Sequence, residues 1–211
     1  MDPTLALQFA QTAAAFAAKL DRLPDDMDPT RLRQTRAPWS RVAALTSPLA
    51  RRRALANLFT QHVAPLPPLA RMRERAPRLA LLDRSTLLRR WCVLAVASRP
   101  GVLRCCIDRE ARGNLQAQLG PAFDALASAG ANGRAMSHRA SSWTPLHWSC
   151  VGHLDWSTLL QPEDAPLRRM ARLSLPPGLL GVAQAMREVP AESSAVQALG
   201  LIDALGLEWT C

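Results

Sequence analysis

The chain has 211 residues, 48% of them hydrophobic, and 26 basic against 17 acidic side chains give it a net charge of +9. This apolar content excludes a disordered chain, and no run of ~20 apolar residues occurs that would predict a membrane-spanning helix. The 17 prolines predict short helices separated by stiff turns. Five cysteines without a C-x-x-C pair favour a reduced, cytoplasmic protein.

The basic excess lies in one third of the chain. Residues 31–99 carry fifteen arginines against two acids, a net charge of +13, whereas residues 1–30 carry −3 and residues 100–211 carry −1. Lys19 is the only lysine. Because a charged surface attracts the opposite charge, this distribution predicts a partner with an acidic surface.

The N-terminal third reads as helices that begin and end at prolines. Apolar residues recur at spacings of three and four over residues 3–23, which is typical of an amphipathic helix. A short basic helix is expected at 29–35, where Pro29 suits the first turn. A longer helix is expected at 47–62, opened by Ser47 and Pro48.

The central region, residues 81–129, reads as consecutive short helices. Pro100 interrupts the first helix and opens the next, Asp108 is placed to cap a third, and Gly120-Pro121 separates the third from a fourth. We expect the large apolar side chains of this region to be buried, namely Leu88, Trp91, Val102, Leu103, Ile107, Leu115, Leu119 and Phe123.

The C-terminal third contains the least regular stretch of the chain. Residues 141–160 hold three of the six tryptophans, and proline and glycine interrupt any long helix. The alternation at Leu146 and Trp148 predicts a short β-like piece. Further helices are expected at 163–173, 179–189 and 193–205.

Together these patterns predict a mainly α fold, a compact multi-helix domain of short helices broken by prolines, with a small irregular or β-containing patch near 141–160. The proline-dense segment 65–68 reads as a stiff extended linker. It divides the chain into an N-terminal helical region, 1–64, and a central and C-terminal helical region, 69–211, unless the chain packs as a single domain.

Histidine and cysteine residues raise the question of a metal site. His147, Cys150 and His153 are spaced by three, and Asp155 follows. On a helix, each step of three turns a ligand by ~60°, and no fourth soft ligand stands at zinc-finger spacing. We therefore interpret these residues as packing within a tryptophan-rich lobe and predict no metal site.

Catalytic motifs are not recognisable in the sequence. Cys105-Cys106 would need a strained turn to form a vicinal bridge, and no histidine is placed beside a cysteine as an activated thiolate requires. No phosphate-binding loop, dinucleotide fingerprint or nucleophile elbow occurs. We predict no catalytic residue, no cofactor and no enzymatic activity.

Two function classes fit the basic charge. A small basic helical nucleic-acid-binding protein would use the arginines for phosphates and Trp39 or Trp91 for stacking. The arginines, however, are scattered over several helices that prolines divide, so we prefer a protein-binding surface. The candidate partner-binding residues are arginines that share helical turns and whose planar forks pair with carboxylates: Arg51, Arg52, Arg53, Arg89 and Arg90.

One run of residues carries a family resemblance. Residues 87–128, LLRRWCVLAVASRPGVLRCCIDREARGNLQAQLGPAFDALAS, place an apolar helix before a small-residue break, a short L-R-x-x-I-D helix, an L-x-x-x-L-G segment and an aromatic residue. This run resembles the K proteins of bacterial type III secretion systems, named SctK and YscK, and their Hrp-type version in plant-associated bacteria. The matching positions are Leu103-Arg104, Ile107-Asp108, Leu115, Leu119-Gly120 and Phe123.

The resemblance implies a cytoplasmic accessory protein of the injectisome sorting platform, located beneath the inner-membrane ring and peripheral to the membrane. Such a protein joins the cytoplasmic domain of the ring protein (SctD-type) to the pod protein (SctQ-type). The implied fold is predominantly α-helical, without catalysis, cofactor, small-molecule substrate or nucleic acid. The resemblance covers residues 80–130 and leaves the role of the tryptophan-rich stretch open.

Overall fold

The computed structural model describes residues 3–34, 39–135, 140, 143–178 and 189–207. Helices account for 71% of these residues, and no strand occurs among them, so the mainly α fold is confirmed. The chain forms two compact units: the first is Met1–Leu87 with Leu160–Pro177, and the second is Leu88–Leu159 with Gly178–Cys211. The proline segment 65–68 lies within the first unit, and a division into folding domains at these prolines stays a prediction.

The first unit is a set of short helices that pack around α1 and α5. The expected helices at 3–23, 29–35 and 47–62 are confirmed to within a few residues, the first ending at Asp21. The elements are α1 (Pro3–Asp21), α2 (Leu23–Asp26), α3 (Pro29–Gln34), α4 (Trp39–Ala43), α5 (Pro48–His62), α6 (Arg75–Arg78), α13 (Ala165–Arg172) and the 3₁₀ turns η1 (Arg71–Arg73), η2 (Leu79–Leu81) and η3 (Pro162–Asp164).

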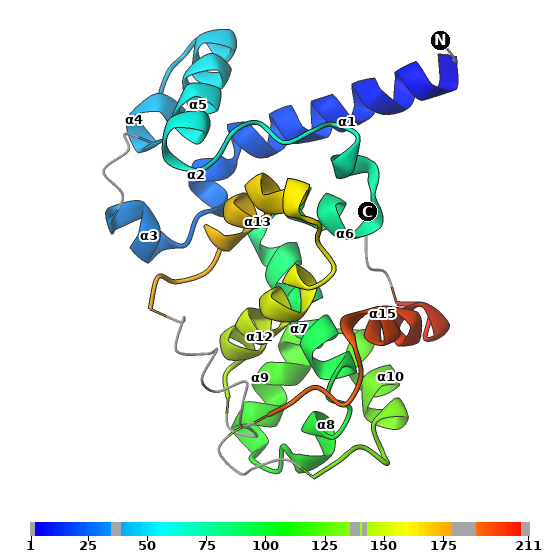
Figure 1. Cartoon of the computed structure of the whole chain (residues 1–211). Coiled ribbons are helices and arrows are strands. Elements are labelled where there is room, and N and C mark those ends of the chain that lie inside the picture. The colour runs from blue at the N-terminus through cyan, green and yellow to red at the C-terminus, as the bar shows by residue number, and fades with distance from the viewer. Residues whose placement is uncertain (1–2, 35–38, 136–139, 141–142, 179–188, 208–211) are drawn as a thin grey trace. The chain divides into compact units, whose positions relative to one another are not determined.

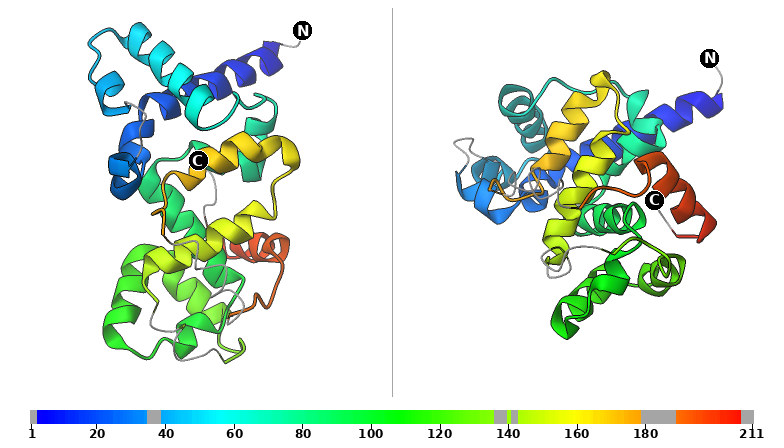
Figure 2. Two further views of the ribbon diagram at one scale, coloured as in Figure 1. Left: turned by 60° about the vertical axis from the view of Figure 1, so that its left-hand side comes forward. Right: turned by 60° about the horizontal axis from the view of Figure 1, so that its bottom comes forward.

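Helices α1 and α5 lie side by side (Figures 1 and 2) because their apolar faces meet. The rings of Phe16 and Phe59 contact edge to face, with centroids 6.2 Å apart, a favoured aromatic geometry. Burial on α1 begins only at Phe16: every described residue from Thr4 to Ala15 is exposed or half-buried. The first half of α1 therefore leaves its side chains largely open to solvent.

A buried network of charged side chains and hydrogen bonds lies near the C-terminal end of α1. The Lys19 side chain is fully buried, and its Nζ donates hydrogen bonds to Asp26 Oδ2 and to the Leu82 carbonyl, both at 2.6 Å. Asp26 Oδ1 accepts a third hydrogen bond from the backbone N–H of Arg84 at 2.9 Å. Burial lowers the pKa of Lys19, although the Asp26 carboxylate opposes this shift.

The second unit contains most of α7 (Arg84–Ala97), α8 (Val102–Cys105), α9 (Arg109–Leu119), α10 (Ala122–Ala129), α12 (Pro145–Ser157) and α15 (Ala195–Ala204). Most sequence signals for the helix ends are confirmed, but Pro100 precedes the N-cap Gly101 and lies outside the first turn of α8. Asp108 Oδ1 accepts a hydrogen bond from the Ala111 N–H at 2.7 Å and caps α9. Gly120, with φ of 58°, ends that helix in the left-handed region that favours glycine.

The predicted apolar core of the second unit is confirmed at six of its eight positions. Its buried members are Trp91, Val102, Leu103, Leu115, Leu119 and Phe123. Ile107 was expected to be buried and is 76% exposed, because residues 106–108 are a non-helical connection between α8 and α9 that breaks the apolar spacing. Leu88 is half-buried, since the neighbouring Leu87 takes the fully buried position on α7.

The expected irregular or β-containing patch near 141–160 is wrong over the described residues. Pro145–Ser157 forms the regular helix α12, with Thr144 as its N-cap and proline in its first turn. Residues from Trp148 to Trp156 are buried nearly all around the helix, so no polar face marks its period. The helices expected at 163–173 and 193–205 are confirmed as η3 with α13 and as α15, whereas residues 179–188 lie outside the described residues.

Candidate partner-binding surfaces

Helix α5 presents the first arginine cluster. Ser47 caps the helix by accepting a hydrogen bond from the Ala50 N–H, and its apolar side is buried through Leu55, Leu58 and Phe59. Arg52 and Arg53 are exposed, whereas Arg51, which lies one turn before Leu55 on the same face of the helix, is half-buried. The predicted cluster Arg51–Arg53 thus has two accessible arginines, Arg52 and Arg53, and one that is partly covered, Arg51.

Within this cluster, Arg52 has an intramolecular partner. Its Nη2 and Nε both donate to Asp21 Oδ2 on α1, at 2.8 and 3.2 Å. The hydrogen bond and the charge of Asp21 raise the pKa of Arg52, so the guanidinium stays charged at any physiological pH. Because the pair is solvent-exposed, a stronger acidic partner could replace Asp21 at small cost.

The second arginine cluster, Arg89 and Arg90, lies on α7. Arg89 is exposed and Arg90 is half-buried. The structure assigns this cluster to the second unit and the α5 cluster to the first. The five predicted residues are therefore distributed over two helices, with one cluster in each unit.

Other arginines of the basic segment form ion pairs with carboxylates of the first unit. Arg71 donates to both carboxylate oxygens of Asp164, at 2.9 and 2.7 Å, and also pairs with Glu74. Burial is the largest effect on Asp164 and opposes its ionisation, but the hydrogen bonds from Arg71 and from the Gln161 N–H, together with the nearby arginine charges, lower the pKa of this carboxyl. Arg84 donates to Asp28 Oδ2 at 2.9 Å. These arginines hold distant segments of the unit together.

Arg99 plays the same part in the second unit. Its side chain is 1% exposed and forms a two-pronged pair with Asp155 at 2.6 and 3.2 Å, and its Nε donates to the Val189 carbonyl at 2.9 Å. Planar, bidentate geometry of this kind is what allows an arginine to be buried. No local pattern announces such a pair, because Arg99 and Asp155 lie 56 positions apart in the sequence.

The tryptophan-rich stretch packs against α7 through a glycine. A Cβ at Gly152 would collide with the backbone carbonyl of Trp91, so the two helices approach closely only because position 152 has no side chain. The indole of Trp91 packs on the His153 ring, with centroids 4.9 Å apart, and on Trp156 at 5.6 Å. Ser149 Oγ donates to the Leu88 carbonyl at 2.8 Å. Most side chains of Trp148–Trp156 are thus part of the interior of the second unit.

The histidines and cysteines that raised the question of a metal site or a reactive thiol have different surroundings in the structure. His147 Nδ1 lies 2.7 Å from Thr144 Oγ1 at the start of α12, and His153 is buried against Trp91. In the described parts of the chain, no group of three or more His, Cys, Asp or Glu side chains is arranged to hold a metal ion. Burial raises the pKa of the Cys106 thiol, which disfavours the reactive thiolate.

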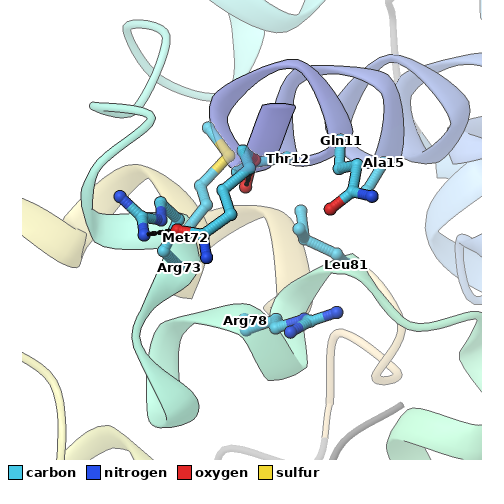
Figure 3. A pocket seen from close by; sticks show the side chains of 8 residues that line it. Gln11, Thr12, Ala15, Met72, Arg73, Arg78 and Leu81 are labelled. Carbon is cyan, nitrogen blue, oxygen red and sulfur yellow. Dashed lines mark hydrogen bonds between the residues drawn. The ribbon is translucent and has the colours of Figure 1, made fainter. Parts of the chain in front are cut away.

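Sequence reasoning missed a hollow in the first unit. It has a volume of about 350 Å³ and lies between α1 and the segment that forms η1, α6 and η2 (Figure 3). Amide and hydroxyl side chains of α1 face arginines across it. The residues that define its walls are Gln8, Gln11, Thr12, Met72, Arg73 and Arg78.

The guanidinium of Arg73 is held in place at the edge of this hollow. Its Nη2 donates to Gln8 Oε1, and its Cζ lies 5.0 Å from the centre of the Phe9 ring, a cation–π arrangement. None of the described residues that line the hollow is acidic. The local potential therefore favours a negatively charged group.

The class of protein that emerges is a helical scaffold with exposed arginine clusters. In the part of the chain that the structure describes, no helix is both long and apolar enough to cross a membrane. The model of a bacterial type III secretion protein family, HrpB4, matches residues 7–207. The chain belongs to this family, which confirms the resemblance carried by residues 87–128. No curated protein and no solved structure matches the chain.

Proposed function

We propose that this type III secretion protein is a non-enzymatic cytoplasmic adaptor of the sorting platform. In this proposal it lies against the inner face of the inner membrane without inserting into it. It joins the cytoplasmic domain of the inner-membrane ring protein (SctD-type) to the pod protein (SctQ-type). It uses no cofactor, no small-molecule substrate and no nucleic acid.

The observation that carries this proposal is the family match over residues 7–207. An apparatus component acts through protein partners, and the chain offers arginine-rich surfaces for such partners. Arginine suits protein interfaces, because its planar fork pairs with carboxylates and also stacks on aromatic rings. An adaptor needs two surfaces, and the clusters Arg51–Arg53 and Arg89–Arg90 belong to different units.

The proposal is tested by affinity purification of the tagged full-length chain from its native host, followed by mass spectrometry. We expect the ring-type and pod-type proteins to co-purify with the unmodified chain. Reversing Arg51, Arg52 and Arg53 to glutamate should abolish recovery of at least one of them and block secretion, because like charges then face the acidic partner. The melting temperature should fall only slightly, because the Arg52–Asp21 pair that the change removes is screened by solvent.

The matched control reverses three other exposed arginines of the first unit, Arg168, Arg169 and Arg172 on α13. This variant has the same net charge and should retain both partners. Recovery of neither partner by the unmodified chain would contradict the adaptor role. Normal recovery by the α5 variant would move the docking site to Arg89 and Arg90, where the corresponding reversal is the next test.

A further inference from the structure

The hollow between α1 and the η1–α6 segment has the chemistry of a peptide-binding site. We propose that it docks an acidic amphipathic segment of a protein partner, with carboxylates against Arg73 and Arg78 and an apolar side chain against the exposed start of α1. This inference rests on the proposed function and deepens it, because it assigns one docking site and the chemistry of its occupant.

The charged part of the argument concerns the wall opposite α1. Arg73 and Arg78 are both exposed side chains that line the hollow, and Figure 3 shows them on the segment that faces α1. Glu74, the one acid of residues 71–78, pairs with Arg71. The two guanidiniums at the hollow thus face no acidic lining residue, and a carboxylate is the group that complements them.

The polar part of the argument concerns orientation. Arg73 is fixed by its hydrogen bond to Gln8 and by the Phe9 ring beneath it, so little side-chain freedom is lost when a carboxylate binds. Gln11 and Thr12 add amide and hydroxyl groups along the opposite wall. The Gln11 amide can accept or donate a hydrogen bond to a peptide, whereas the Thr12 hydroxyl already donates to the Gln8 carbonyl at 2.8 Å and can only accept one.

The apolar part of the argument concerns the beginning of α1. Leu5 is 37% exposed, so an apolar side chain near the start of α1 is open to solvent and accessible to a partner. Residues three and seven apart share a helix face, so Leu5 continues the face of Gln8 and Thr12 by one turn. A partner helix that carries both acidic and apolar side chains would complement the arginines of the hollow and the apolar start of α1.

The binding test uses two fluorescent synthetic helical peptides and the full-length chain. One peptide has glutamate and leucine at helical spacing, and the other has lysine in place of each glutamate. Fluorescence anisotropy should show binding of the glutamate peptide alone. The double variant Arg73→Ala/Arg78→Ala should weaken that binding about tenfold, and Leu5→Ser should weaken it further. The matched control Arg168→Ala/Arg169→Ala, two exposed arginines of the same unit, should leave it unchanged.

Equal binding of the glutamate peptide by the Arg73/Arg78 variant, or no binding by the unmodified chain, would overturn the proposal. So would Arg73- and Arg78-dependent capture by anionic lipid vesicles without peptide binding, which would indicate a membrane surface instead. Recovery of ring and pod proteins from the host without peptide binding contradicts the docking site alone. Peptide binding without recovery of those proteins contradicts the proposed adaptor function alone.

Discussion

At the scale of single residues, two positively charged side chains are buried in the interior of the protein. Lys19 lies at 0% exposure and Arg99 at 1%, and each is accompanied by an aspartate and by backbone carbonyls. A buried charge is tolerated only when it is paired and hydrogen-bonded. Both aspartates are consequently structural residues, although nothing in their sequence neighbourhood distinguishes them from surface acids.

The Lys19–Asp26 pair gives a stability prediction. Asp26→Asn keeps an acceptor for the Arg84 N–H but leaves the Lys19 ammonium without its counter-charge, so we expect a loss of ~3–5 kcal/mol in the free energy of unfolding. The double variant Lys19→Met/Asp26→Asn removes the stranded charge and should be more stable than the single variant. Urea unfolding followed by circular dichroism measures both. A single variant within ~1 kcal/mol of the unmodified protein would show that the pair is not a buried one.

At the scale of elements, helix ends are fixed by short side chains that satisfy backbone N–H groups. Asp83 precedes α7, and its Oδ1 accepts from the Thr86 N–H at 3.0 Å and from Ser85 Oγ at 2.6 Å. Burial of Asp83 opposes its ionisation, but these hydrogen bonds outweigh that effect and lower its pKa. The cap of α7 is therefore stronger when Asp83 is ionised.

This cap predicts a pH-dependent effect on stability. Asp83→Ala should cost about 1 kcal/mol at pH 7. Because the folded-state pKa lies below the ordinary value of ~3.9, the contribution of Asp83 is complete above about pH 4 and is lost as the pH falls through the folded-state pKa. Chemical denaturation at neutral and acid pH measures the free energy of unfolding of both proteins. The difference between the unmodified protein and Asp83→Ala should become smaller in acid. Asp83→Asn is the control, because asparagine caps a helix but does not titrate. The difference in the free energy of unfolding between Asp83→Asn and Asp83→Ala should be the same at neutral and acid pH.

The contact of α12 with α7 gives a second prediction at this scale. Gly152→Ala places a methyl group against the Trp91 carbonyl, and such overpacking costs roughly 1–3 kcal/mol. Gly113, on α9, has open space around it, so Gly113→Ala should stabilise the protein by about 0.5–1 kcal/mol through helix propensity. Thermal unfolding of the two variants should move the melting temperature in opposite directions. Equal shifts would mean that α12 does not require the glycine.

At the scale of the whole molecule, tertiary contacts redistribute the charge that the sequence concentrates. Arg71, Arg84 and Arg99 belong to the +13 segment 31–99, whereas their partners Asp164, Asp28 and Asp155 lie outside it. Folding brings these opposite charges together. The surface is consequently less basic than the local sequence indicates, and the remaining exposed arginines occupy several separate helices.

This redistribution bears on the nucleic-acid alternative. We expect only weak binding to generic double-stranded DNA, lost near physiological salt, because the exposed arginines are spread over several helices rather than gathered on one. Fluorescence anisotropy at increasing salt measures the slope, which reports the number of phosphates contacted. Tight binding that discriminates between DNA sequences would favour a nucleic-acid-binding function over the proposed adaptor.

The sequence by itself determined where most helices begin and end. Prolines at 48 and 100, the caps Ser47 and Asp108, and Gly120 act on neighbouring residues, so their effect is legible locally. The apolar spacing likewise determined most of the core of the second unit. These are interactions over one or two helical turns, and they need no knowledge of distant segments.

Only the tertiary structure decided the features that depend on remote residues. Helix α12 is buried nearly all around, so its sequence has no polar face, and Gly152 is a site of helix contact where the sequence pattern indicated a helix breaker. The roles of Arg71 and Arg99 depend on aspartates 93 and 56 positions away. The hollow at Arg73 exists because α1 meets a segment 65 positions later in the chain, and periodicity within one element carries no record of such a meeting.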